Sequence, residues 1–135
     1  MSKIEAVLFD LDGTLLDSFP DFLASLENIN INSSSKKINE SIVRANVSDG
    51  SSKLLKLVFD IDTDDDGFDE HKRNFLNEYE KNILMYGNLF HGVSDLLNFL
   101  LDKKIPYGIV TNKPRKYTEI ILKKSSLLRQ SKVVI

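Results

Sequence analysis

The sequence contains no cysteine, and this absence excludes both disulfide bonds and metal sites built from thiolates. It also has no apolar run near the roughly 18 consecutive residues that a membrane-spanning helix needs. The first ten residues, MSKIEAVLFD, lack the long apolar segment and cleavage site that are typical of a secretory signal peptide. We therefore expect no membrane partner and a location in the reducing cytoplasm.

Charge is unevenly distributed along the 135 residues, although the formal net charge is only −2. Residues 1–100 hold 9 Lys or Arg against 18 Asp or Glu, a balance of −9, whereas residues 101–135 hold 9 against 2, a balance of +7. A basic segment is typical of proteins with an anionic partner, but a solvated helix face has the same composition. The segment lacks the aromatic-studded basic ribbon that binds nucleic acid, so we expect no nucleic-acid partner.

Short apolar segments and helical periodicity alternate along the chain. Strands are predicted at residues 4–10, 105–110 and 132–135, and the first ends in an apolar run without alternation, as in a strand buried on both faces. Apolar spacing predicts helices at residues 19–30, 75–86 and 93–101, and a last one that opens at Pro114 and includes Leu128. A weak helix is predicted at residues 38–45, and the turn at residues 48–52 leads into a short helix that holds Leu54, Leu55 and Val58. The polar stretch INSSSKK at residues 31–37 is predicted to be a loop.

Strands that alternate with helices predict an α/β fold with a parallel sheet. We expect a Rossmann-like core with three strands, formed by residues 1–16 and 87–135, and an inserted α-helical domain formed by residues 17–86. Ligands bind such sheets at the carboxyl ends of the strands. Asp10, Asp12 and Thr111 all fall at these ends, so we expect them to face one crevice.

Residues 10–14, DLDGT, follow the first strand and resemble the nucleophile motif D-x-D-G-T of the haloacid dehalogenase superfamily. VTNK at residues 110–113 resembles its second motif, a Ser or Thr that ends the next core strand. The segments FHGVSDLLNFL and IPYGIVTNKP resemble in particular the phosphoglycolate phosphatase group. Residues 17–86 lie at the position where that group carries its small α-helical cap. The resemblance covers essentially the whole chain and implies a phosphatase.

The resemblance implies a role for each carboxylate of the first motif. Asp10 would attack phosphorus and form an aspartyl-phosphate, and Asp12 would protonate the leaving alkoxide and then deprotonate the attacking water. Mg²⁺ would be held by the Asp10 carboxylate and the Asp12 backbone carbonyl, which are the oxygen ligands that this cation prefers. The substrate would be a small phosphorylated metabolite of the phosphoglycolate type.

Phosphate-binding groups are implied on both motifs. Backbone N–H groups near Leu11, the Thr111 hydroxyl and the Asn112 amide would hold the phosphoryl oxygens as preorganised donors. Lys113 would either reach the phosphate or lie solvated beside the following helix. Gly50, in the turn SDGSS at residues 48–52, would either help to select the substrate from the cap or form a plain helix-entry turn.

Two further motifs of the superfamily, a Lys and an acidic pair, normally lie beyond the third strand. The only carboxylate side chain after Thr111 is Glu119, and Lys132 opens the third strand. We therefore expect a chain truncated before these motifs and a phosphatase activity that is impaired. The alternatives are a non-catalytic fragment that self-associates, or a phosphosugar mutase of the same superfamily. Without a fourth strand the first strand keeps an open edge, which favours a homodimer or a domain swap.

The acidic run DIDTDDDG at residues 60–67 offers a competing calcium site, because it matches D-x-D-x-D-G. The closing Glu of such a loop is replaced by Arg73, and the usually apolar eighth position holds Asp69. We therefore expect a solvated acidic loop. His71 and His91 have no partner pattern, and we expect surface or turn positions for both.

Overall fold

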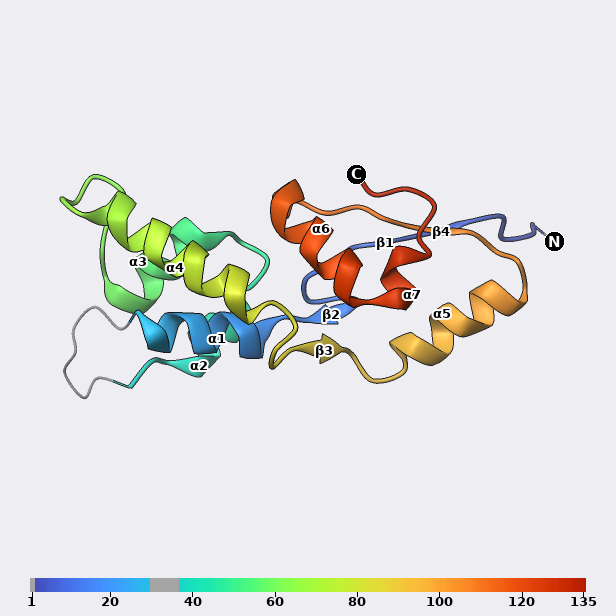
Figure 1. The fold of residues 1–135 in the computed structure, drawn as a ribbon, viewed down its shortest axis with the longest axis horizontal. Coiled ribbons are helices and arrows are strands. Elements are labelled where there is room, and N and C mark those ends of the chain that lie inside the picture. The colour runs from blue at the N-terminus through green and yellow to red at the C-terminus, as the bar shows by residue number, and fades with distance from the viewer. Residues whose placement is uncertain (1, 30–36) are drawn as a thin grey trace. The chain divides into compact units, whose positions relative to one another are not determined.

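A computed structural model describes residues 2–29 and 37–135 (Figure 1). The chain divides into two compact units, which we call the core unit (Met1–Asp17 with Asn88–Ile135) and the helical unit (Ser18–Gly87). The boundaries expected from the sequence, after residues 16 and 86, each lie one residue before those of the structure, which follow Asp17 and Gly87. The loop predicted at residues 31–37 lies outside the described residues except for Lys37.

The core unit is built on a parallel strand pair. Strand β1 (Val7–Phe9) pairs with β4 (Tyr107–Ile109), with Val7 opposite Tyr107 and Phe9 opposite Ile109. Both strands are shorter than the predicted ranges of 4–10 and 105–110. The prediction that β1 is buried on both faces is wrong, because Leu8 is 62% exposed on a face of the sheet that is open to solvent.

The C-terminal residues follow the other edge of β4. Ile109 N–H donates to the Val133 carbonyl at 2.9 Å, and Thr111 N–H donates to the Ile135 carbonyl at 2.8 Å. The segment lies in parallel beside β4, but it forms one isolated bridge, Ile109 to Val134, instead of the predicted third strand. Gly108 permits this close approach, since a Cβ there would stand 2.6 Å from Val133 Cγ1.

A second, antiparallel strand pair marks the place where the chain leaves and re-enters the core unit. Strand β2 (Leu16–Asp17) pairs with β3 (Asn88–Leu89), with Leu16 opposite Leu89. The sequence does not predict this pair, because strands of two residues carry no periodicity. The pair holds the two crossing segments next to each other within the core unit.

Three helices complete the core unit: α5 (Val93–Asp102), α6 (Arg115–Lys124) and α7 (Ser126–Arg129). The predicted apolar stripe of α5 is only partly buried, since Leu96 and Leu101 are 42% and 37% exposed. The two-stranded parallel sheet and the short α7 therefore do not cover all the apolar side chains of α5. The helix predicted from Pro114 through Leu128 is broken at Ser125, whose hydroxyl accepts from Leu128 N–H and starts α7.

The helical unit contains α1 (Phe19–Asn28), α2 (Glu40–Ala45), α3 (Ser51–Phe59) and α4 (Phe68–Asn82). Its centre is an aromatic stack between α1 and α4, in which the Phe22 and Tyr79 rings lie 4.4 Å apart and nearly parallel, beside Phe75. The prediction that α4 continues to Tyr86 is wrong, because the chain turns at Leu84 with a φ of 57°. Tyr86 is 58% exposed. None of the described helices is both long and apolar enough to cross a bilayer.

Candidate active site

The site is built at the carboxyl end of β1. Val110 N–H donates to the Phe9 carbonyl at 2.8 Å, which carries the parallel pairing one residue past the strand ends. Asp10, the next residue, is exposed. Continuation of the same register places Leu11 beside Thr111, so the two motifs meet at one edge of the sheet, as the sequence predicts.

A tight turn separates the two carboxylates of the first motif. The Leu11 side chain is fully buried, and the Leu11 carbonyl accepts N–H donors from residues 14, 15 and 16. Gly13 adopts a φ of 83°, a conformation that a residue with a Cβ rarely takes. The turn leaves Asp10 in solvent and buries Asp12, whose exposed fraction is 9%.

Lys113 forms an ion pair with Asp12 inside the core unit. The Lys113 Nζ atom lies 2.9 Å from Asp12 Oδ2, and the two side chains are only 4% and 11% exposed. A solvated Lys113, one of the two alternatives left open by the sequence, is therefore wrong. The second motif instead brings a positive charge against the second carboxylate of the first motif.

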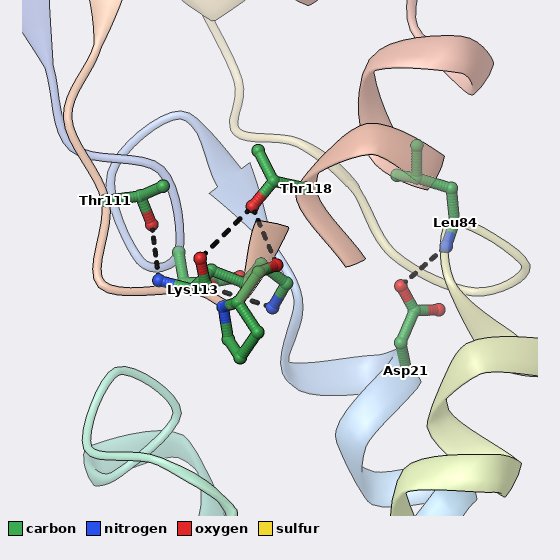
Figure 2. A network of polar contacts seen from close by, with 7 residues as sticks. Asp21, Leu84, Thr111, Lys113 and Thr118 are labelled. Carbon is green, nitrogen blue, oxygen red and sulfur yellow. Dashed lines mark hydrogen bonds and ion pairs between the residues drawn. The ribbon is translucent and has the colours of Figure 1, made fainter. Parts of the chain in front are cut away.

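The loop between β4 and α6 fixes this lysine through its backbone (Figure 2). Lys113 N–H donates to Thr111 Oγ1 at 3.1 Å. The Thr118 hydroxyl, on α6, lies 3.4 Å from the Lys113 carbonyl and 3.3 Å from the Pro114 carbonyl. Asn112, between the two fixed residues, is exposed and faces solvent.

Two residues near this centre make contacts that the sequence does not predict. Thr14 belongs to the DLDGT motif, which implies no contact for it, yet its hydroxyl lies 3.4 Å from Asp10 Oδ2, within reach of a hydrogen bond. Thr118 is 3% exposed and orients the Lys113 peptide group. Residues 10–14 form a turn and not a helix, so their spacing does not predict the contact between Asp10 and Thr14, and Thr118 has the pattern of an ordinary helix residue.

The oxygen atoms at the end of β1 supply some of the ligands that a hard divalent cation such as Mg²⁺ needs. Asp10 and Asp12 supply carboxylate and carbonyl oxygens from one strand end, and Mg²⁺ characteristically takes one or two carboxylates and completes its shell with water and phosphate. Within residues 2–29 and 37–135, no group of three or more His, Cys, Asp or Glu is placed to hold a metal ion. The same finding applies to residues 60–67, where the Asp62 carboxylate pairs with Lys56 at 2.8 Å.

Gly50 lies in the helical unit, where it caps the N-terminus of α3. Its φ is 95°, and no atom lies within 4 Å of the place a Cβ would occupy. The backbone therefore explains why a glycine stands here, and its selection of substrate stays a prediction. Of the two histidines, His91 is exposed as predicted and His71 is half-buried on α4.

A family model described as haloacid dehalogenase-like hydrolase matches residues 7–135. An N-acetylmuramic acid 6-phosphate phosphatase from Pseudomonas putida is 32% identical over 133 residues, which are 98% of this chain and 60% of that protein. A phosphoglycolate phosphatase from Xanthomonas campestris pv. campestris is 38% identical over 117 residues, which are 87% of this chain and 52% of that protein. This chain thus spans little more than half the length of these curated relatives.

The fold has a close counterpart among crystal structures. The structure of a predicted phosphoglycolate phosphatase from Haemophilus somnus superposes with a TM-score of 0.83 at 25% identity. The match covers the whole of this chain and 63% of that one. The parallel sheet with its helical insert is therefore the Rossmann-like α/β fold that the sequence predicts.

Proposed function

Because the chain belongs to the haloacid dehalogenase-like hydrolase family, we propose that it provides the nucleophile half of a phosphatase site. The reaction is hydrolysis of a small phosphate monoester through an aspartyl-phosphate. The observation that best supports this proposal is the arrangement at the end of β1. There an exposed carboxylate, Asp10, stands two residues before the buried Asp12–Lys113 ion pair.

In the first half of the reaction an Asp10 carboxylate oxygen attacks phosphorus, and the bond between phosphorus and the ester oxygen breaks. Asp12 enters this step protonated and gives its proton to the leaving alkoxide, which leaves the Asp12 carboxylate paired with Lys113. The products are a free alcohol and phosphorylated Asp10. Asp10 suits the attack because it is solvent-exposed and its Oδ2 atom lies 3.4 Å from the Thr14 hydroxyl. The hydroxyl limits the orientations that the carboxylate adopts.

In the second half a water molecule attacks the same phosphorus and gives its proton to Asp12. The bond between phosphorus and the Asp10 oxygen breaks, inorganic phosphate leaves, Asp10 returns to its carboxylate form, and Asp12 has regained the proton that it gave to the alkoxide. The Asp10 carboxylate and the Asp12 carbonyl are the groups that would hold Mg²⁺. A bound Mg²⁺ would neutralise phosphoryl charge. Leu11 N–H, Thr111 and Asn112 would bind the phosphoryl oxygens.

The names of the relatives suggest two substrate classes. One is a phosphorylated two-carbon acid, phosphoglycolate, and the other is a phosphorylated amino sugar, N-acetylmuramic acid 6-phosphate. Both are small phosphate monoesters, which fits the phosphoryl-binding groups proposed above, Leu11 N–H, Thr111 and Asn112. We therefore propose a small phosphorylated metabolite as the substrate, and an assay of phosphate release from both esters compares them.

Substitution of Asp10 by Asn tests the proposal. We expect the wild-type chain to release phosphate from at least one of phosphoglycolate, N-acetylmuramic acid 6-phosphate or an aryl phosphate when Mg²⁺ is present. Asp10→Asn should lower kcat by at least about 10³-fold, because an amide is a poor nucleophile. Removal of Mg²⁺ by a chelator should also abolish turnover.

The matched control is Asp102→Asn, which removes an exposed carboxylate from α5 in the same unit. It should keep the wild-type rate. Rapid quenching followed by intact-mass measurement should show the mass of one added phosphoryl group on the wild type and none on Asp10→Asn. Equal rates for Asp10→Asn and the wild type would refute the assignment of the nucleophile.

A further inference from the structure

The most unusual side chain in the core unit is Lys113, which carries a positive charge almost out of contact with solvent. Its side chain is 4% exposed, although lysine is among the residue types that are least often buried. Its partner, Asp12, comes from a segment 101 residues away in the sequence. The pair therefore joins the two motifs of the site through their side chains.

Burial of such a pair carries an energetic cost. Moving a carboxylate and an ammonium out of water requires several kcal/mol per ion, and their mutual attraction often fails to offset that loss. A buried ion pair is thus weak evidence for a stabilising role. Its position at the carboxyl end of β1, two residues from the exposed Asp10, points to a role in the site.

The backbone around Lys113 restricts where its side chain can go. Its N–H is held by Thr111 Oγ1 at 3.1 Å, and its carbonyl faces the buried Thr118 hydroxyl at 3.4 Å. Pro114 follows directly, and its fixed φ of −54° sets the start of α6. The two peptide groups of Lys113 are therefore fixed before the side chain extends to Asp12.

We propose that Lys113 is a positioning residue, which holds the Asp12 carboxylate in the orientation that proton transfer requires. An ammonium at 2.9 Å from one carboxylate oxygen restricts the rotation of that side chain. Misplacement of an acid–base group by about an ångström is enough to cost roughly 10²-fold in rate. This role differs from direct binding of the phosphate, and it depends on the phosphatase function proposed above.

A double-mutant cycle between Lys113→Met and Asp12→Asn tests the inference by kinetics. We expect Lys113→Met to lower kcat by about 10²-fold, with the KM for the ester changed by less than about threefold. The double mutant should be no slower than Asp12→Asn alone, since Lys113 acts through Asp12. Losses in kcat that multiply, or a KM that rises while kcat is kept, would show that Lys113 binds the phosphate instead.

Thermal unfolding provides a second readout that does not need turnover. Lys113→Met should lower Tm by several degrees because it leaves a buried carboxylate uncompensated, and the double mutant should recover part of that loss. The control is Lys116→Met, which removes an exposed charge from the same helix and should change neither kcat nor Tm. Equal Tm values for Lys113→Met and the wild type would overturn the inference.

The two readouts separate failure of this inference from failure of the proposed function. A wild-type chain with no turnover on any of the esters contradicts the function, and with it the role of Lys113 in proton transfer. An active wild type whose kcat survives Lys113→Met contradicts only the inference. The ester used in the cycle is the one that the wild type hydrolyses fastest.

Discussion

Asp21, in the first turn of α1, is a carboxylate with only 1% of its surface exposed. Its Oδ2 atom accepts from Leu84 N–H at 2.8 Å (Figure 2). Its Oδ1 atom accepts from Tyr86 and Gly87 N–H, both at 2.9 Å. The Asp21 side chain therefore links the last residues of the helical unit, which follow α4, to α1, the first helix of that unit.

Replacement of Asp21 by Ala should destabilise the chain by about 3 kcal/mol or more, because three backbone donors lose their acceptor in a buried site. Asp21→Asn should cost less, since one amide oxygen remains to accept. Urea denaturation monitored by circular dichroism measures both differences. The control is Asp69→Asn, an exposed acid in the first turn of α4, which should change the unfolding free energy by less than about 0.5 kcal/mol.

At this scale the sequence predicted the residues of the site better than their contacts. The grouping of Asp10, Asp12 and Thr111 followed from their places after strands, and the parallel register of β1 and β4 explains it. The partner of Lys113 could not be predicted, because a side chain with four rotatable bonds leaves its direction open. Asp21 resembled an ordinary first-turn acid that complements the helix dipole.

At the scale of elements, tertiary contacts set the ends that periodicity left open. The helix stripes of α1 and α5 were visible because apolar residues recur on one face. Strands of two or three residues carry too few positions for a pattern, so β2 and β3 were missed and the C-terminal strand was overestimated. The break at Ser125 depends on its cap to Leu128, a local contact that competes with helix continuation.

Strand β4 and helix α7 are connected by one buried phenol. The Tyr107 hydroxyl donates to the Leu127 carbonyl, and only 2% of the residue is exposed. Burial raises the pKa of Tyr107 above its usual value near 10. In the unfolded chain the phenol has its usual pKa, so the folded state keeps the phenol proton up to a higher pH than the unfolded state does. The stability contributed by this group is complete below about pH 10 and is lost as the pH rises through the raised pKa.

Tyr107→Phe tests this linkage. The variant should lose about 1 kcal/mol at neutral pH, because the Leu127 carbonyl loses its donor. Between about pH 9 and pH 11 its stability should fall less steeply than that of the wild type. Urea denaturation across this range measures the slope, with Tyr86→Phe as a control, since Tyr86 is 58% exposed. Identical slopes for the wild type and Tyr107→Phe would contradict the assignment.

For the whole molecule, exposed apolar side chains gather in the core unit. Of the large hydrophobic residues that the described chain exposes, eight belong to this unit: Ile4, Leu8, Leu96, Phe99, Leu101, Val110, Val133 and Ile135. In the described residues β1 pairs with β4 along one edge and with no strand along the other. A strand edge with apolar neighbours is a template for pairing with a second chain.

We therefore propose that the chain self-associates through the open edge of β1. Light scattering and sedimentation should show a dimer that forms as the concentration rises. Leu8→Lys should weaken the dimer by at least tenfold in Kd, about 1.4 kcal/mol, because a charge on an edge strand opposes pairing. Leu57→Lys, at a 42% exposed position of the helical unit, is the matched control and should leave the dimer unchanged. A chain that stays monomeric at high concentration, or a dimer that both variants keep equally, would exclude this edge as the interface.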